Sequence, residues 1–166
     1  MLIAFGGLPG SGKSTVAQAL ARRIGAVYLR VDTVEQAIRT SAPLAEGRDV
    51  GPSGYVTLYR LAADNLRLGQ TVVADSVNPL PETRKAFRDV ADECGRRFFG
   101  VEIVCSDAAV HRHRAETRSP SVVGLSPPSW EVIQNRHYEP WKADLRIDTA
   151  RLSVEDSVAE IMRSMG

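Results

Sequence analysis

The residues best suited to chemistry lie near the start of the chain, in a glycine-rich stretch. It reads Gly-x-x-x-x-Gly-Lys-Ser from Gly7 to Ser14, and Thr15 follows. This is the Walker A pattern, in which backbone N–H groups surround a phosphate, the lysine reaches the β- and γ-phosphates, and the hydroxyl binds Mg²⁺. The alternative, a glycine-rich turn without a ligand, would not need the lysine and the hydroxyl. ATP and Mg²⁺ are therefore predicted to bind here, and the nucleotide-binding residues to be Gly7, Pro9, Gly10, Ser11, Gly12, Lys13, Ser14 and Thr15.

The flanking residues supply the context that this motif needs. An apolar run, Leu2 to Phe5, precedes it, and a helical pattern with Val16, Leu20 and Ile24 on one face follows it. A strand, a loop and a helix in this order place the loop at a helix N-terminus, where anions bind well.

Two aspartates follow other predicted strands. Asp32 comes directly after the β-rich run 26–31, and Asp75 closes the apolar run 71–74. A phosphotransferase needs a carboxylate to accept the proton of the attacking hydroxyl and another to help hold Mg²⁺. Asp32 is predicted to be the base, and Ser14 with Asp75 to be the metal ligands. Asp32 could also be a helix N-cap, and which aspartate is the base stays open.

The residues expected to contact the phosphate acceptor are Asp32, Asp75, Arg39 and Asn78. Arg39 lies seven residues after Asp32, so both project from the same side of a helix. Asn78 either touches the acceptor or forms the turn before Pro79. The stretch 40–60 is expected to wall the acceptor pocket, with Arg48, Tyr55, Tyr59 and Arg60 as candidates.

A basic segment follows the fourth predicted strand. It contains His111, Arg112, His113 and Arg114, with Arg118 one helical turn further on. Arg114 and Arg118 share a helical face with His111, whereas Arg112 lies across from it. The next ten residues, 119–128, hold three prolines and read as part of a hinged lid. Arg114 and Arg118 are predicted to stabilise charge on the transferring phosphoryl group, although a solvated helix face is the simpler reading. The two histidines are two apart and point in different directions, which argues against a metal site.

The composition is typical of a globular domain. The chain has 166 residues, 43% hydrophobic, and a formal net charge of +1. This length predicts one domain, residues 1–166, and the balanced charge argues against nucleic-acid or membrane partners. Cys94 and Cys105 have no metal-ligand spacing, and no apolar run approaches the length of a membrane span. With a strand predicted from residue 2, no signal peptide is expected, which predicts a cytoplasmic protein.

Strands and helices alternate along the chain, which predicts a parallel sheet with helices on both faces. In such sheets the ligand lies at the carboxyl ends of the strands, where the Walker A loop, Asp32, Asp75 and the arginines all fall. Irregular segments are expected at 41–54 and 119–128. The strands are predicted at 2–5, 26–31, 71–74, 98–104 and 145–147, and the later helices at 33–40, 55–68, 81–94, 107–118, 129–138 and 153–165.

These motifs resemble the small bacterial P-loop kinases of the AAA-type ATP-binding group, whose members include gluconate kinase, shikimate kinase, chloramphenicol phosphotransferase and the kinase half of polynucleotide kinase. The resemblance rests on the Walker A stretch, Asp32 with Arg39, Val-Val-Ala-Asp-Ser at 72–76, the basic segment, and Ile-Asp-Thr at 147–149. It implies an α/β P-loop NTPase fold with a five-stranded parallel sheet in the order 2-3-1-4-5 and a helical lid at about 107–140. It also implies that Arg112 and Thr149 lie near the adenine. Shikimate and gluconate kinases carry Asp-x-Asp after strand two, whereas this chain has Asp32-Thr33-Val34, so neither substrate is assigned.

The predicted function is transfer of the γ-phosphoryl group of ATP to a hydroxyl of a small molecule, which could be a sugar acid, an antibiotic, a nucleoside or a nucleotide. A nucleic-acid end kinase is one alternative, although it would want a basic groove. A nucleotide switch or other non-kinase ATPase is the other, although the chain has no Asn-Lys-x-Asp and no Leu-Ser-Gly-Gly-Gln motif. The expected partners are ATP and the acceptor, and the oligomeric state is not predicted.

Overall fold

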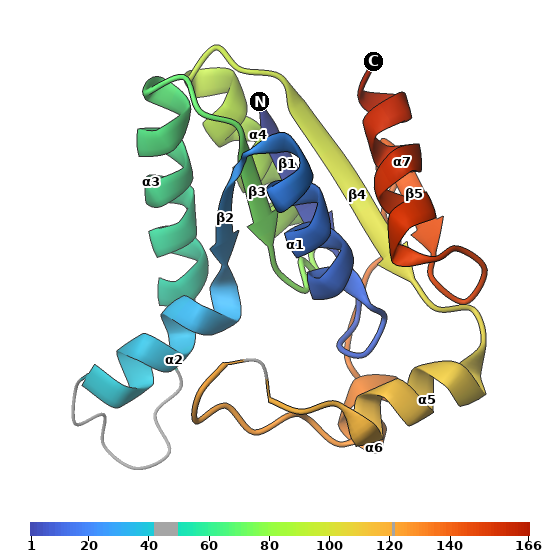
Figure 1. Cartoon of the computed structure of the whole chain (residues 1–166). Coiled ribbons are helices and arrows are strands. Elements are labelled where there is room, and N and C mark those ends of the chain that lie inside the picture. Colours follow the sequence, from blue (N-terminus) through green and yellow to red (C-terminus); the bar gives the residue numbers. More distant parts are fainter. Residues whose placement is uncertain (42–49, 121) are drawn as a thin grey trace.

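A five-stranded parallel sheet forms the centre of the computed structural model, which describes residues 1–41, 50–120 and 122–166 (Figure 1). The strand order is β2-β3-β1-β4-β5, which confirms the predicted topology. Each observed strand lies within two residues of its predicted bounds. The strands are β1 (Leu2–Gly6), β2 (Val27–Arg30), β3 (Val72–Asp75), β4 (Phe98–Val104) and β5 (Leu145–Asp148).

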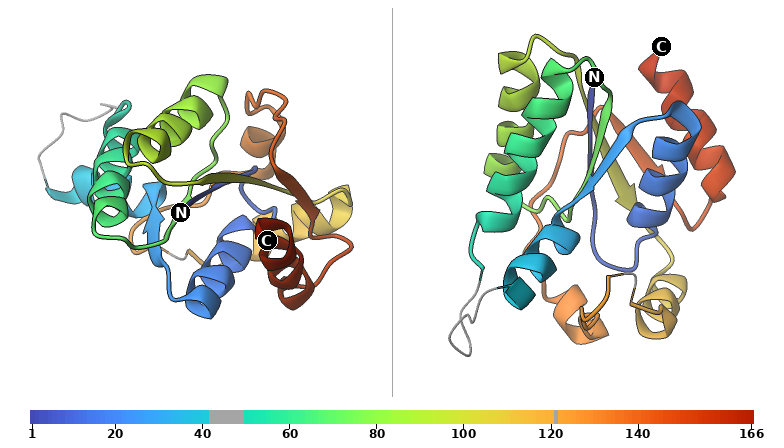
Figure 2. Two further views of the ribbon diagram at one scale, coloured as in Figure 1. Left: turned by 90° about the horizontal axis from the view of Figure 1, so that it is seen from above. Right: turned by 60° about the vertical axis from the view of Figure 1, so that its left-hand side comes forward.

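Both faces of the sheet are covered by helices (Figure 2). Helices α1 (Lys13–Ile24) and α7 (Val154–Met165) pack on one face, and α3 (Ser53–Arg67) and α4 (Pro81–Glu93) on the other. Along β1, Ile3 and Phe5 join the first cluster, whereas Leu2 and Ala4 join the second. Because both faces of β1 are buried, its sequence is apolar throughout rather than alternating.

Three helices lie around the edge where the strands end (Figure 1). They are α2 (Val31–Ser41), α5 (Ala108–Thr117) and α6 (Trp130–Gln134). Asp107 accepts hydrogen bonds from the first-turn N–H groups of Ala109 and Val110, and Ser129 caps α6 in the same way. These caps explain why both helices begin where the sequence predicts.

The structure corrects the end of α6, which the helical pattern carried to residue 138. Helix α6 stops at Gln134, and the chain continues without regular structure past Trp141. The buried Arg84 side chain donates hydrogen bonds to the carbonyl oxygens of Glu139 and Pro140, and its guanidinium lies over the rings of Tyr138 and Trp141. These contacts come from α4, so local sequence could not predict them.

Smaller differences concern the other helices. Helix α2 begins at Val31 and α3 at Ser53, each two residues before its predicted start. Most of the loop predicted at 41–54 lies outside the described residues. In α7 the buried apolar side chains are Val158 and Ile161. The helical pattern also predicts Val154 and Met162 on this apolar face, but both are exposed. Within the described ranges, no helix combines the length and apolarity needed to cross a membrane.

Candidate active site

The loop between β1 and α1 requires glycine at specific positions. Gly7, Gly10 and Gly12 have φ angles of 142°, 84° and 88°, values that favour glycine. A Cβ on Gly7 would also lie 2.2 Å from the carbonyl oxygen of Ile103. The loop therefore curls tightly over the end of the sheet and leads directly into α1 at Lys13, which creates the anion-binding geometry of a helix N-terminus.

Lys13 and Asp75 form a buried ion pair beneath this loop. Lys13 Nζ donates to Asp75 Oδ1 at 2.5 Å, and the Asp75 side chain is fully buried. The Tyr28 hydroxyl donates to the other oxygen, Oδ2, also at 2.5 Å, and Arg30 Nε lies 3.9 Å from it. Burial raises the pKa of Asp75, but the Lys13 ammonium and hydrogen bonds from Lys13, Tyr28 and Ser14 outweigh it and hold that pKa below its usual value. Asp75 is therefore an ionised carboxylate at neutral pH.

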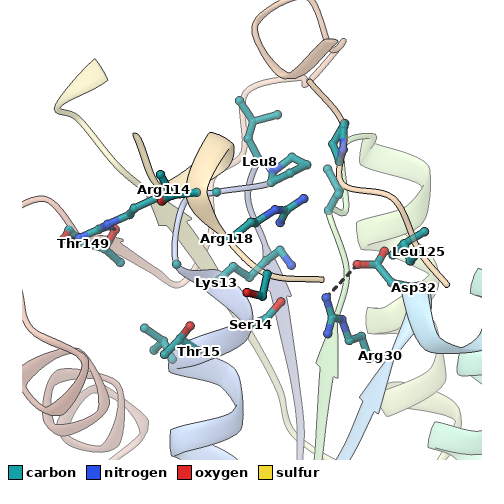
Figure 3. Close-up of a pocket in the computed structure, with 18 of the residues that line it drawn as sticks. Leu8, Lys13, Ser14, Thr15, Arg30, Asp32, Arg114, Arg118, Leu125 and Thr149 are labelled. Carbon is teal, nitrogen blue, oxygen red and sulfur yellow. Dashed lines mark hydrogen bonds and ion pairs between the residues drawn. The ribbon is translucent and has the colours of Figure 1, made fainter. Parts of the chain in front are cut away.

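A cavity of about 840 Å³ opens above this ion pair. Figure 3 shows Arg114 and Thr149 at one end, Lys13, Ser14 and Arg118 in the middle, and Arg30, Asp32 and Leu125 at the other end. The volume falls within the range of small-molecule sites. Its described lining residues are Leu8, Pro9, Gly10, Gly12, Lys13, Ser14, Thr15, Val16, Arg30, Asp32, Glu35, Arg39, Val77, Arg114, Thr117, Arg118, Ser119, Leu125, Ser126, Pro128, Arg136, Thr149, Leu152, Ser153 and Val154.

Hydrogen bonds tie the lid segment to the glycine-rich loop at residues 7–12, the phosphate loop. Thr149 Oγ1 donates to the carbonyl oxygen of Ser11 at 2.7 Å and accepts from Arg114 Nη1 at 2.9 Å. His111 Nε2 lies 2.9 Å from the carbonyl oxygen of Pro9. Helix α5 and the turn after β5 are thus held against the loop, so Arg114 is fixed at one wall of the cavity.

Two charged side chains mark the opposite end of the cavity. Arg30 Nη2 donates to Asp32 Oδ2 at 3.2 Å, and Asp32 stays partly exposed to the cavity. Arg118 lies near both (Figure 3). Partial desolvation lowers the pKa of the Arg118 guanidinium. The negative charge of Asp32 raises this pKa and the positive charge of Arg30 lowers it, so that the pKa lies below its usual value.

The structure gathers most of the predicted site residues around this one cavity. From the glycine-rich loop it places Pro9, Gly10, Gly12, Lys13, Ser14 and Thr15 there, and from other elements Asp32, Arg39, Arg114, Arg118 and Thr149. Gly7 and Ser11 of the loop and Asp75 at the end of β3 are buried and do not line the cavity.

Other candidates lie elsewhere. Arg112 pairs with Glu116 on the exposed side of α5, outside the cavity, so the arginine that contacts Thr149 is Arg114. Asn78 is fully buried in a left-handed conformation, with a φ of 52°, and its neighbour Val77 lines the cavity instead. Of the expected acceptor wall, Tyr55 and Tyr59 pack around Phe87, Arg60 is also outside the cavity lining, and Arg48 lies outside the described residues.

Four ionisable residues of the site were not anticipated: Tyr28, Arg30, Glu35 and Arg136. Tyr28 and Arg30 are two residues apart in a predicted strand, and this spacing indicates that both side chains point to the same face of the sheet. The register that pairs Arg30 with Asp75 becomes visible only once β2 lies beside β3.

The donor set below the cavity fits a nucleotide-bound Mg²⁺. This ion binds through one or two carboxylates together with substrate phosphates and water, and Ser14 and Asp75 supply a hydroxyl and an ionised carboxylate that already lie close enough to hydrogen-bond. Among the described residues, no group of three or more His, Cys, Asp or Glu side chains forms a metal site of its own.

Comparison with known proteins identifies the family. Residues 2–136 match the family model described as an AAA domain. The chain belongs to this family. Its resemblance to small P-loop kinases is confirmed as well.

The curated relatives include a kinase. An adenylyl-sulfate kinase of Geotalea uraniireducens is 27% identical over 176 residues, which cover 98% of this chain and 79% of that protein. A sulfate adenylyltransferase of Neosartorya fischeri is 26% identical over 167 residues, or 94% of this chain. The chain spans only 28% of the length of that protein.

Solved structures show the same fold. A putative kinase from Chloroflexus aurantiacus superposes with a TM-score of 0.75 at 21% identity, over 99% of this chain and 94% of that one. An APS kinase from Mycobacterium tuberculosis, in complex with AMPPNP and APS, gives 0.66 at 22% identity, over 99% and 96%. A gluconokinase from Sinorhizobium meliloti gives 0.69 at 20% identity, over 98% and 90%.

Proposed function

We propose that this protein is a kinase that transfers the γ-phosphoryl group of ATP to a hydroxyl group of a small molecule. The observation that carries the proposal is the single cavity that joins a glycine-rich phosphate loop and Lys13 to a carboxylate, Asp32, at its other end. A related adenylyl-sulfate kinase, 27% identical over almost the whole chain, supports the same reaction class.

The roles of the residues follow from their places along the cavity. Backbone N–H groups of the loop and the Lys13 ammonium bind the phosphates, for which Lys13 leaves its ion pair with Asp75. Asp32 accepts the proton of the acceptor hydroxyl as that oxygen attacks the γ-phosphorus. Arg118, in the middle of the cavity, stabilises the negative charge of the phosphoryl group in transit. Arg114, which the sequence also suggested for this role, is bonded to Thr149 at the end away from Asp32, where the nucleoside of ATP would bind.

Ser14 and Asp75 would hold Mg²⁺, which when bound neutralises charge on the phosphate oxygens. In this proposal Tyr28 has a supporting role, since its hydroxyl donates to Asp75 Oδ2 while Lys13 donates to Oδ1. The ion pair between Lys13 and Asp75 keeps both side chains next to the cavity.

Transfer from γ-labelled ATP to a panel of hydroxyl compounds tests this function. The panel comprises sugar acids, adenosine 5′-phosphosulfate, nucleosides, nucleotides, chloramphenicol and an oligonucleotide with a free 5′ end. We expect a phosphorylated small molecule, and Asp32→Asn should lower kcat by roughly 10²–10⁴-fold because the amide cannot accept the proton. Binding of AMPPNP, followed by calorimetry, should change little in this variant.

The exposed Asp64, on α3 and paired with Arg67, offers a matched control. Asp64→Asn should retain full activity. Equal activity of Asp32→Asn and the wild type would contradict the assignment of the base. ATP hydrolysis with no phosphorylated product would favour the nucleotide switch, and labelling of the oligonucleotide alone would favour the end kinase.

A further inference from the structure

The distribution of charge in the cavity bears on the acceptor. Among the described residues, six cationic side chains line the cavity, and two carboxylates line it with a third directly beneath. A magnesium-bound nucleoside triphosphate brings about two net negative charges. The cavity would then keep an excess of positive charge. The cations are Lys13, Arg30, Arg39, Arg114, Arg118 and Arg136, and the carboxylates are Asp32, Glu35 and Asp75.

The excess comes from arginines that have no carboxylate partner among the described residues. Both wall carboxylates are already paired, Asp32 with Arg30 at 3.2 Å and Glu35 with Arg39 at 3.4 Å. Across the described ranges, no carboxylate lies within 4.0 Å of the guanidinium groups of Arg118 or Arg136. Within the part of the chain that the structure describes, Arg118 and Arg136 therefore have no carboxylate partner, whereas Arg39 donates Nη2–H to Glu35 Oε2.

Arg118 contributes to this excess. Its side chain is exposed and lines the middle of the cavity (Figure 3). A bound anion would form a charge-assisted pair with such a guanidinium. Guanidinium groups bind carboxylate, sulfate and phosphate in a bidentate manner, so each of these would fit.

We infer that the acceptor is an anion: a small hydroxyl compound that also carries a carboxylate, sulfate or phosphate group, held by Arg39 and Arg136 while its hydroxyl faces Asp32. This inference rests on the proposed function. It separates charged acceptors, such as sugar acids and nucleotides, from neutral ones, such as nucleosides and chloramphenicol. Arg118, in the middle of the cavity, pairs with the phosphoryl group that passes from ATP to the acceptor.

Binding of simple anions tests the inference without knowledge of the acceptor. Wild-type protein is first saturated with AMPPNP and Mg²⁺, so that the phosphate loop is filled, and is then titrated by calorimetry with sodium sulfate, phosphate or acetate at constant ionic strength, with chloride as the blank. We expect saturable binding of at least one anion. The anion that binds most tightly indicates which charged group the acceptor carries. Arg39→Gln and Arg136→Gln should each weaken that binding by about tenfold, as the loss of one charge-assisted contact does.

Arg67, an exposed arginine on α3 that pairs with Asp64, is the matched control, and Arg67→Gln should bind the anion as the wild type does. No saturable binding, or equal binding by all three variants and the wild type, would overturn the inference. AMPPNP binding in the first step separates the two proposals. If AMPPNP binds but none of the anions does, only the inference of an anionic acceptor is refuted. If AMPPNP does not bind, the proposed kinase function is refuted as well.

Discussion

At the scale of the single residue, Asp75 shows how much of the site is built below the cavity surface. Lys13 of α1 and Tyr28 and Arg30 of β2 surround its fully buried carboxylate, so two separate segments of the chain meet at Asp75. A buried charge is tolerated only when hydrogen bonds and opposite charges replace the lost water. Tyr28 provides one of these bonds without lining the cavity.

Tyr28→Phe removes only the hydroxyl that donates to Asp75. We expect a loss of about 1.5–3 kcal/mol in the free energy of unfolding, because the bond is to a charged group in a buried site. Urea denaturation measures it. Tyr59→Phe is the control, since the Tyr59 hydroxyl donates to a neutral carbonyl, that of Thr83, at 3.3 Å, and its loss should cost about 0.5–1.5 kcal/mol. Equal losses in the two variants would mean that the Asp75 contact adds nothing.

At the scale of the element, the phosphate loop and α5 behave as one unit. His111 and Ala115 of α5 lie against Gly10, and His111 Nε2 reaches the carbonyl oxygen of Pro9. Arg114 then bonds Thr149, which bonds Ser11. The position of α5, and of the lid segment that follows it, is thus coupled to the conformation of the loop.

Gly10→Ala should disturb this unit. The new Cβ would lie 3.1 Å from both the Ala115 Cβ and the His111 Cδ2 atoms, at a φ of 84°. Gly95→Ala is the control, because Gly95 also has a positive φ, 61°, but open space around it. Both variants should lose about 1–2 kcal/mol of stability from the left-handed backbone.

Only Gly10→Ala should also weaken AMPPNP binding, by about tenfold or more, when measured by calorimetry. The physical reason is that α5 must move away from the loop to make room for the methyl group. If Gly10→Ala bound AMPPNP as tightly as Gly95→Ala does, the loop and α5 would not be coupled in the way proposed.

At the scale of the whole molecule, the buried ion pair should link stability to pH. The pKa of Asp75 is lowered on folding, so its contribution is fully present above the unfolded value of about 3.9 and is lost as the pH falls through the lower folded pKa. Asp75→Asn cannot titrate. At pH 7 this variant should be about 3–5 kcal/mol less stable than the wild type, because Lys13 is left buried without its partner.

This difference should shrink as the pH is lowered below about 4, when denaturant unfolding is measured on both proteins across the range. The exposed-site variant Asp64→Asn should differ little from the wild type at any pH. A wild-type advantage over Asp75→Asn that is as large at pH 3 as at pH 7 would contradict the ionised carboxylate.

Features that depend on neighbours in the chain were predictable from the residues in order. The glycine spacing at 7–12 determines the loop, because steric limits on φ act within single residues. Asp107 and Ser129 mark helix starts, because their hydrogen bonds reach only to the first helical turn. The alternation of apolar runs with helical patterns indicates a sheet covered by helices. These features placed Lys13, Ser14 and Asp32 at one edge of a parallel sheet.

Other features exist only because distant segments meet. The pairing of β2 with β3 brings Tyr28 and Arg30 to Asp75, and Arg84 of α4 holds the chain that follows α6 in an irregular course where a helical pattern continued. The choice of Arg114 over Arg112 at the cavity depends on which face of α5 packs against the phosphate loop. Burial and interactions between charges that are distant in sequence determine these contacts, and neither can be predicted from the spacing of residues along the chain.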